Sequence, residues 1–268
     1  MRIPRTQGAG AQRIAAAFAD SGKRAAFMPY MMGGFPDLGT SRGIGEAYAA
    51  AGADLIELGV PFSDPLADGP AIQAAGTAAL REGVTVEDVL RLGGALAANV
   101  PVVLMAYANQ VFARGPESFA RDLGASGLSG LIVPDLPMEE APALLEACDA
   151  AGVALVPLVA PTTTDERLAE IGARARGFLY TVSVVGTTGE RDALDGLASV
   201  LSRARAHAEV PVAAGFGIST PEQAVAAASA GADGVIVGSR LVRAAAEADD
   251  PPAAVAGLVG EFAAALKG

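Results

Sequence analysis

Short apolar runs rich in Val, Leu and Ile recur eight times along this 268-residue chain, and longer Ala-rich segments separate them. The runs span residues 25–32, 54–60, 101–107, 130–135, 154–160, 177–183, 211–217 and 234–239. In the intervening segments, for example 139–151 and 219–230, apolar residues recur at the spacing of one helix face. This alternation predicts a parallel sheet whose successive strands are joined by helices.

The pattern within the runs indicates a closed barrel. The runs are continuously apolar, as expected of parallel strands that are covered on both faces. Glycines in the junctions 51–54, 151–154 and 230–233 favour left-handed helix ends that turn the chain into the next strand. A dinucleotide-binding glycine motif does not follow the first run, and no break divides the chain into halves. We therefore predict an α/β fold, a single (β/α)₈ TIM barrel over residues 1–268, with residues 1–10 as a flexible N-terminal segment.

Two departures from a minimal barrel are expected to matter for function. A helix is predicted before the first strand, over residues 11–21. A gap of 47 residues separates the starts of the second and third runs, and it contains a Pro-rich loop from Pro61 to Pro70 and two helices over 72–81 and 85–98. Long loops at the carboxyl ends of barrel strands are where barrel enzymes carry their active sites.

The composition excludes several classes of protein. With 19 Lys and Arg against 30 Asp and Glu the formal charge is −11, which argues against a nucleic-acid or anionic-membrane surface. The chain has no apolar run long enough to span a membrane, so a cytoplasmic protein is expected. One Cys and one His argue against a disulfide scaffold and a zinc site. The two lysines, Lys23 and Lys267, lie near the chain ends and argue against a Schiff-base lysine from the middle of the barrel. Catalysis would rest on carboxylates, hydroxyl groups and backbone.

Glu57 lies inside the second apolar run. Strand alternation places it on one face with Leu55 and Gly59, so that its side chain points either into the barrel or into the helix layer. Both places are dry, and burial raises the pKa of a carboxyl group toward neutrality, which suits a general acid and base. A structural glutamate, hydrogen-bonded to a neighbouring strand, is the alternative.

Two further carboxylates follow in the Pro-rich loop. Asp64 and Asp68 stand between Pro61, Pro65 and Pro70, which restrict the backbone of the loop. A stiff loop over the barrel mouth could hold a second catalytic carboxylate. The alternative is that the aspartates cap the helix that begins near Pro70.

Glycine-rich turns follow the last three strands, at 186–189, 215–219 and 238–239. Glycines allow backbone N–H groups to approach an anion closely, and the start of a helix adds a favourable dipole. The turns after the last two strands of a TIM barrel are the usual phosphate site. The three turns together therefore predict a phosphate-binding site opposite the loop from Pro61 to Pro70, here called the acidic loop because it carries Asp64 and Asp68.

These segments, in this order, resemble the α-subunit family of tryptophan synthase. The similarity covers nearly the whole chain and rests on LIELGVPFSDPLADGPAIQ at 55–73, AYAN at 106–109, PDLP at 134–137, GTTG at 186–189, GFGIS at 215–219 and GSR at 238–240. It implies a lyase that cleaves indole-3-glycerol phosphate to indole and glyceraldehyde 3-phosphate. The indole would pass to a β subunit in an αββα heterotetramer. Pyridoxal phosphate would be held by that partner, with no cofactor or metal in this chain.

The resemblance also implies roles for individual residues. Glu57 matches the general acid and base of the family, and Asp68 matches the carboxylate that accepts the indole N–H. The matches to the phosphate site are Gly189, Gly217, Gly238 and Ser239. The matches to the substrate pocket are Tyr30, Met105, Tyr180 and Thr188. The matches to the β-subunit contact are Asp64 and Asn109.

Three other functions are compatible with parts of this pattern. A stand-alone lyase that releases free indole would carry the same catalytic residues. A phosphosugar-binding barrel without catalysis would keep the glycine turns, although the presence of both Glu57 and Asp68 argues against it. An isomerase of an aminated ribulose would place its carboxylates on other strands, which the position of Glu57 in the second run disfavours.

Overall fold

A computed structural model of the chain describes residues 8–182, 190–215 and 217–268. Within these residues nine strands pair in parallel in one sheet, in the order β5-β4-β3-β2-β1-β9-β8-β7-β6. β5 and β6 are consecutive in the chain and separated by Pro157 alone, so the two ends of this order meet. The sheet closes on itself, and the predicted barrel is confirmed.

The strands fall within the eight predicted apolar runs. Their bounds are β1 Ala26–Met32, β2 Ile56–Gly59, β3 Val102–Met105, β4 Gly130–Ile132, β5 Ala154–Val156, β6 Leu158–Val159, β7 Leu179–Val182, β8 Val212–Gly215 and β9 Gly234–Val237. One predicted strand, 154–160, is interrupted at Pro157, a residue with no N–H to donate to the ladder. The barrel therefore has eight strand positions, and the fifth of them is split in two.

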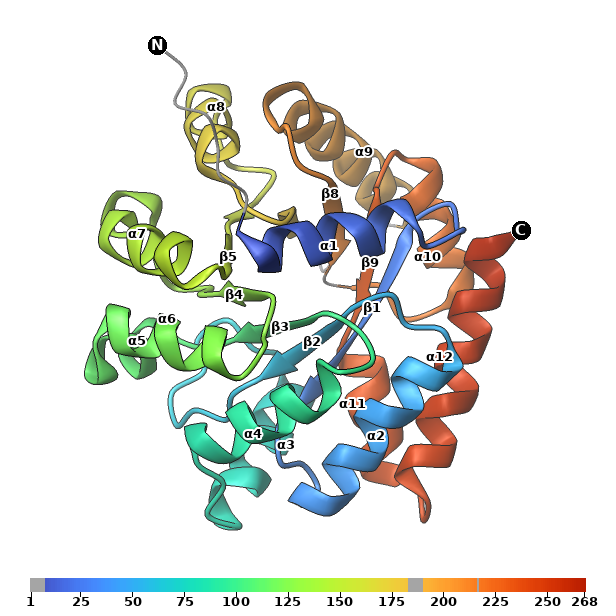
Figure 1. The fold of residues 1–268 in the computed structure, drawn as a ribbon. Helices are drawn as coiled ribbons and strands as arrows, with labels where there is room; N and C mark the ends of the chain where they lie inside the picture. Colours follow the sequence, from blue (N-terminus) through green and yellow to red (C-terminus); the bar gives the residue numbers. More distant parts are fainter. Residues whose placement is uncertain (1–7, 183–189, 216) are drawn as a thin grey trace.

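Helices surround the sheet, as the alternation predicts (Figure 1). Their bounds are α1 Ala9–Ala19, α2 Leu38–Ala51, α3 Pro70–Arg81, α4 Val86–Leu96, α5 Ala108–Arg114, α6 Pro116–Ala125, the 3₁₀ helix η1 Met138–Glu140, α7 Pro142–Ala151, α8 Asp165–Arg174, α9 Glu190–His207, α10 Pro221–Ser229, α11 Ser239–Glu247 and α12 Pro251–Lys267. The two helices expected after the second strand are α3 and α4. α1 begins at Ala9, inside the segment expected to be flexible, and residues 1–7 lie outside the described part.

Local sequence signals mark many of the helix ends. Thr85 and Thr220 form capping boxes at the starts of α4 and α10, and each accepts a backbone N–H with its hydroxyl oxygen. At the helix-to-strand junctions Gly52, Gly152 and Gly231 have φ of 107°, 73° and 104°. These are left-handed conformations that glycine adopts without a steric penalty, as the three junction sequences predicted.

Two apolar layers result from the alternation of side chains along the strands. The layer between strands and helices contains Ile56 and Leu58 of β2 and Leu104 of β3, all fully buried. The layer inside the barrel contains Leu55, Val103 and other side chains of the opposite parity. A strand residue thus belongs either to the interior or to the helix layer according to its position in the alternation.

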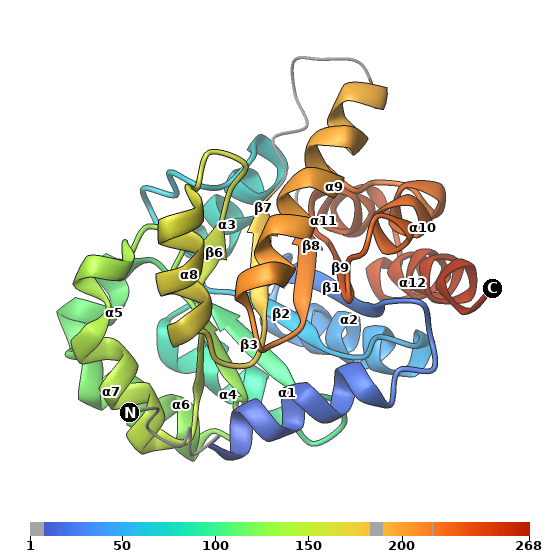
Figure 2. The same cartoon turned by 90° about the horizontal axis from the view of Figure 1, so that it is seen from above.

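α1 closes the amino-terminal end of the barrel. In Figure 1 it crosses the barrel, and in Figure 2 it lies along the edge opposite α3. Ile14 of α1 is fully buried and packs into the interior layer, and the N–H of Gly10 donates to the Gly152 carbonyl at 2.8 Å, just ahead of β5. The loops that follow the strands lie at the opposite, carboxyl-terminal end of the barrel. Within the described residues no helix is long and apolar enough to cross a membrane.

Candidate active site

The predicted site residues gather at the carboxyl ends of neighbouring strands. β2, β1, β9 and β8 are consecutive in the sheet. Glu57 lies in β2, Tyr30 lies in β1, and Gly238 and Gly217 follow β9 and β8. The carboxyl ends of parallel strands meet at one edge, so a single mouth holds all four.

The Glu57 side chain points into the barrel and not into the helix layer. Its parity partner Leu55 packs in the interior layer, whereas Ile56 and Leu58 pack against the helices. The Glu57 side chain is 3% exposed, and its Oε2 has no hydrogen-bond partner. Burial, with a smaller contribution from the nearby negative charge of Asp68, raises the pKa of Glu57 to about 8. A carboxyl group in this state holds a proton near neutral pH, as a general acid requires.

Asp68 lies in the loop between β2 and α3, half-buried. It does not cap α3: the N-cap is Gly69, and no side chain accepts a cap hydrogen bond there. Burial raises the pKa of Asp68 to about 6, and a hydrogen bond from the Tyr107 side chain acts in the opposite direction. Asp68 is therefore largely ionised at neutral pH while Glu57 is largely protonated. Neighbouring carboxyl groups whose pKa values are pushed apart typify an acid–base pair.

Tyr30, Met105 and Tyr180 form part of the wall around Glu57. All three are buried in the interior layer. Tyr30 is the register partner of Glu57 across β1 and β2, and Met105 is the partner of Gly59 across β2 and β3. Burial and the charge of Glu57 both raise the pKa of Tyr30 and of Tyr180, so the two phenols stay protonated. The structure brings these three of the four predicted pocket residues together.

Glycines allow these tyrosines to lie against the strand ends. A Cβ on Gly59 would lie 2.1 Å from the Tyr30 hydroxyl oxygen, and a Cβ on Gly215 would lie 2.4 Å from that of Tyr180. Both distances are far below van der Waals contact. Glycine is therefore required at both positions if the two phenols are to keep their places.

Gly217 and Gly238 follow two neighbouring strands, β8 and β9. Ala213 of β8 pairs with Gly234 of β9, and the two glycines follow these partners by four residues each. Gly217 is exposed with φ of 81°, while Gly238 is the N-cap of α11 and Ser239 is its first residue. The first N–H groups of a helix have no acceptor within it, and they favour an anion. Two other predicted residues, Gly189 of the phosphate set and Thr188 of the pocket set, lie outside the described residues.

The two residues predicted to contact a partner are exposed. Asp64 lies in the loop after β2, and Asn109 lies in the first turn of α5 after β3. β2 and β3 are neighbours in the sheet, so both residues belong to the same side of the mouth. Their positions are compatible with a shared contact surface.

Tyr107 and Gln110 were not predicted individually, yet both contact the acidic loop. The Tyr107 hydroxyl oxygen accepts the backbone N–H of Ala67 at 3.0 Å, and the Gln110 side-chain amide donates to the Pro61 carbonyl at 3.0 Å. Tyr107 belongs to the AYAN motif, directly after the third strand. A polar residue at the carboxyl end of a barrel strand is a signal that could have identified it.

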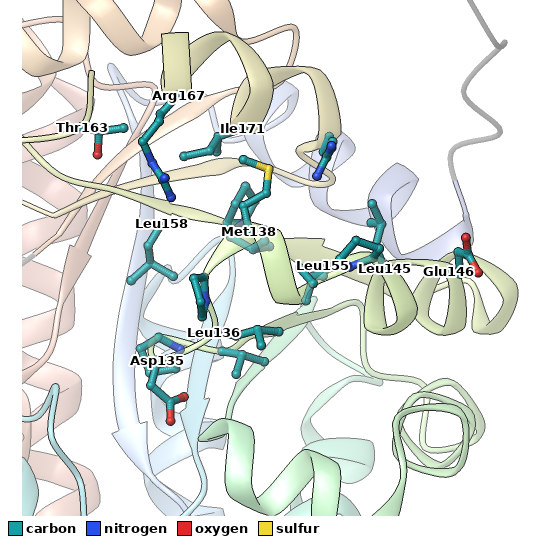
Figure 3. A pocket seen from close by; sticks show the side chains of 18 residues that line it. Asp135, Leu136, Met138, Leu145, Glu146, Leu155, Leu158, Thr163, Arg167 and Ile171 are labelled. Atoms are coloured by element: carbon teal, nitrogen blue, oxygen red, sulfur yellow. The ribbon is translucent and has the colours of Figure 1, made fainter. Parts of the chain in front are cut away.

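A cavity lies on the side of the barrel where β4 and β5 end. It has a volume of about 540 Å³ and opens between α7 and α8, beside the ends of β4 and β5 (Figure 3). Leu136, Met138, Leu155 and Ile171 line it, and Arg167 at its edge pairs with Glu139 at 2.6 Å. None of the predicted site residues lines it. Within the described residues there is also no cluster of three or more potential metal ligands.

The family model of the tryptophan synthase alpha chain matches residues 17–267. A curated relative, the tryptophan synthase alpha chain of Methanosarcina mazei, is 50% identical over 221 residues, which cover 82% of this chain and 81% of the relative. That of Phenylobacterium zucineum is 49% identical over 244 residues, which cover 89% of this chain and 88% of the relative.

Solved structures give the same result. Tryptophan synthase from Mycobacterium tuberculosis, in an aminoacrylate- and BRD0059-bound form, contains a chain with a TM-score of 0.86 and 38% identity. The match covers 95% of this chain and 98% of that one. A structure of the tryptophan synthase α2β2 complex from Pyrococcus furiosus matches with a TM-score of 0.84 and 36% identity, over 90% of this chain and 98% of that one.

Proposed function

The chain belongs to the tryptophan synthase alpha chain family, and on that premise we propose that Glu57 and Asp68 carry out its reaction at the barrel mouth. The chain is a lyase of tryptophan biosynthesis that cleaves indole-3-glycerol phosphate to indole and glyceraldehyde 3-phosphate. The observation that carries the assignment of residues is the burial of Glu57 inside the barrel, 3% exposed and with an unpaired Oε2, next to a loop that holds the half-buried Asp68. The separation of their pKa values, about 8 for Glu57 and about 6 for Asp68, supports it.

The reaction divides between the two carboxyl groups. Protonated Glu57 donates its proton to C3 of the indole, while the Asp68 carboxylate accepts the ring N–H and stabilises the positive charge that develops on this nitrogen. The Glu57 carboxylate then takes the proton of the neighbouring side-chain hydroxyl group. As the aldehyde forms, the carbon–carbon bond breaks and its electron pair returns to the indole ring. Glu57 ends the cycle protonated, as it began.

The phosphate group would bind at the opposite side of the same mouth. Gly217, Gly238 and Ser239, with Gly189, provide backbone N–H groups and the start of α11 for an anion. Tyr30, Met105, Tyr180 and Thr188 would enclose the indole and the glycerol. A phosphate held there fixes the distance between substrate and Glu57, and positioning of this kind can contribute several orders of magnitude in rate. We also propose that residues 1–268 form one barrel domain.

The chain works as the α subunit with a β subunit, as do the relatives solved as complexes. This favours a partnered subunit over a stand-alone lyase. Asp64 and Asn109, both exposed beside the mouth, are the residues we assign to the partner contact. We further propose an αββα assembly in the cytoplasm, with pyridoxal phosphate held by the β subunit and no cofactor in this chain.

Glu57→Gln in the assembled enzyme tests the assignment. The substitution keeps the size of the side chain and removes the titrating proton, so we expect cleavage of indole-3-glycerol phosphate to fall by about 10²- to 10⁴-fold. Glu46→Gln is the matched control, because Glu46 is an exposed residue of α2 that pairs with Arg42. Cleavage by Glu57→Gln at the wild-type rate would refute the acid–base role. Rates with and without an added β subunit measure the partnership.

A further inference from the structure

We propose that Tyr107 is a positioning residue, whose hydroxyl group fixes the loop that carries Asp68 and orients the Asp68 carboxylate at the barrel mouth. This inference rests on the role proposed above for Asp68. Tyr107 follows β3, at the start of α5, and its side chain contacts the acidic loop that follows β2.

The Tyr107 hydroxyl group has two neighbours on adjacent residues of the loop. Its oxygen accepts the Ala67 N–H at 3.0 Å, which leaves its own O–H free to donate. The acceptor beside it is the Asp68 carboxylate, and this interaction lowers the pKa of Asp68. A phenol that accepts from the backbone and donates to the next carboxylate fixes both the path of the loop and the direction of the side chain.

The ring of Tyr107 is held independently of its hydroxyl group. Its side chain is 3% exposed, and its ring stacks on Phe62 with centroids 5.1 Å apart and planes 25° from parallel. Phe62 is part of the same loop, six residues before Asp68. Removal of the hydroxyl group alone should therefore leave the ring and the stacking in place.

Other side chains hold the loop backbone without acting on the carboxylate. Gln110 donates to the Pro61 carbonyl at 3.0 Å, and Gln73 donates to the Asp68 carbonyl at 2.8 Å. These contacts fix the two ends of the loop. Burial raises the pKa of Asp68, and the hydrogen bond from the Tyr107 side chain lowers it. The other titratable groups whose charges interact with that of Asp68 are Glu57 and Tyr30, and neither stabilises its ionised form.

Tyr107→Phe in the assembled enzyme tests the proposal. We expect kcat/KM for indole-3-glycerol phosphate to fall by about 10- to 100-fold, the range of one hydrogen bond to a charged group. We also expect the acidic limb of the pH profile to move up by about one unit, because the ionised form of Asp68 loses a donor. A direct titration of Asp68 by carbon NMR should give the same upward change in its pKa, independently of turnover.

Tyr48→Phe is the matched control. Tyr48 is fully buried, and its hydroxyl group donates to the Tyr30 carbonyl at 3.2 Å, so the same atom and one hydrogen bond are removed elsewhere. It should lower the melting temperature and leave the pH profile unchanged. An unshifted acidic limb and an unchanged pKa of Asp68 in Tyr107→Phe would overturn the proposal. Asp68→Asn separates the positioning role of Tyr107 from the catalytic role of Asp68. Full activity in this variant would refute the catalytic role of Asp68 itself.

Discussion

Tyr30 and Glu57 are direct partners in the parallel pairing of β1 with β2, and both side chains point into the barrel. On its other side Glu57 is paired with Val103 of β3. A phenol and an apolar side chain therefore flank the carboxyl group, and neither carries a positive charge. The raised pKa of Glu57 follows from this setting, and it links the proposed catalysis to the stability of the fold.

Glu57 should make the fold less stable as the pH rises. Its pKa is about 8 in the folded chain and near 4.5 when exposed, so the folded state binds the proton more tightly. The resulting stabilisation is fully present below pH 4.5 and is lost as the pH rises toward 8, at up to about 1.4 kcal/mol per unit. Denaturant unfolding of wild type and Glu57→Gln should therefore diverge over this range, the variant being relatively more stable at pH 8.

The two carboxyl groups should give cleavage a bell-shaped pH profile. The rate rises as Asp68 ionises, near pH 6, and falls as Glu57 loses its proton, near pH 8. The measurement is kcat/KM for indole-3-glycerol phosphate from pH 5 to 9 at constant ionic strength. A profile that rises monotonically through pH 8 would contradict a protonated Glu57 as the reactive form.

Gly59→Ala should damage the site through Tyr30. The new Cβ would meet the Tyr30 hydroxyl oxygen at 2.1 Å, and the phenol would have to leave its place beside Glu57. We expect loss of kcat/KM and destabilisation of about 1–3 kcal/mol, as for other overpacked cores. Gly196→Ala in α9 is the control, because open space surrounds that position. Equal effects of the two substitutions would show that steric contact with Tyr30 is not the cause.

The barrel was predictable because each strand is buried on both faces and each helix on one. These burial patterns leave continuous apolar runs and a period of 3.6 in the sequence, and the runs contain the observed strands. The interruption at Pro157 was not predicted, because a proline in an apolar run does not by itself mark a break: β1 continues through Pro29, which pairs with Val237 of β9. Local chemistry thus accounts for the elements and for most of their ends.

Contacts between distant residues were not predictable in the same way. Alternation along the strand predicts that Glu57 and Leu55 share one face of the sheet. It does not predict whether that face is the interior of the barrel or the helix layer, because only packing distinguishes the two. Tyr107 and Ala67 are 40 residues apart, and Lys23 and Asp54 are 31 apart. No periodicity within a segment specifies such pairs. They depend on how the closed sheet brings strand ends and loops together.

Glycines in helices should respond to substitution according to the space around them. Gly257 of α12 has open space where a Cβ would be, so Gly257→Ala should stabilise the chain by about 0.5–1 kcal/mol through backbone entropy and helix propensity. At Gly45 of α2 a Cβ would lie 2.4 Å from Leu96, and Gly45→Ala should destabilise it. Thermal unfolding of both variants decides this, and a change of the same sign in both would contradict it.

Lys23 should be a major contributor to stability. Its ammonium group pairs with Asp54 at 2.8 Å, and the two side chains are only 5% and 11% exposed. The Asp54 carboxylate also accepts the Phe27 N–H at 2.7 Å, which ties the start of β2 to β1. Lys23→Met would leave this carboxylate buried without its cation, and we expect a loss of about 3–5 kcal/mol in the free energy of unfolding. Arg42→Met is the comparison, since the exposed pair of Arg42 with Glu46 should contribute less than about 0.5 kcal/mol. Denaturant unfolding at pH 7 measures both, and similar losses in the two variants would mean that burial does not set the contribution of the Lys23 pair.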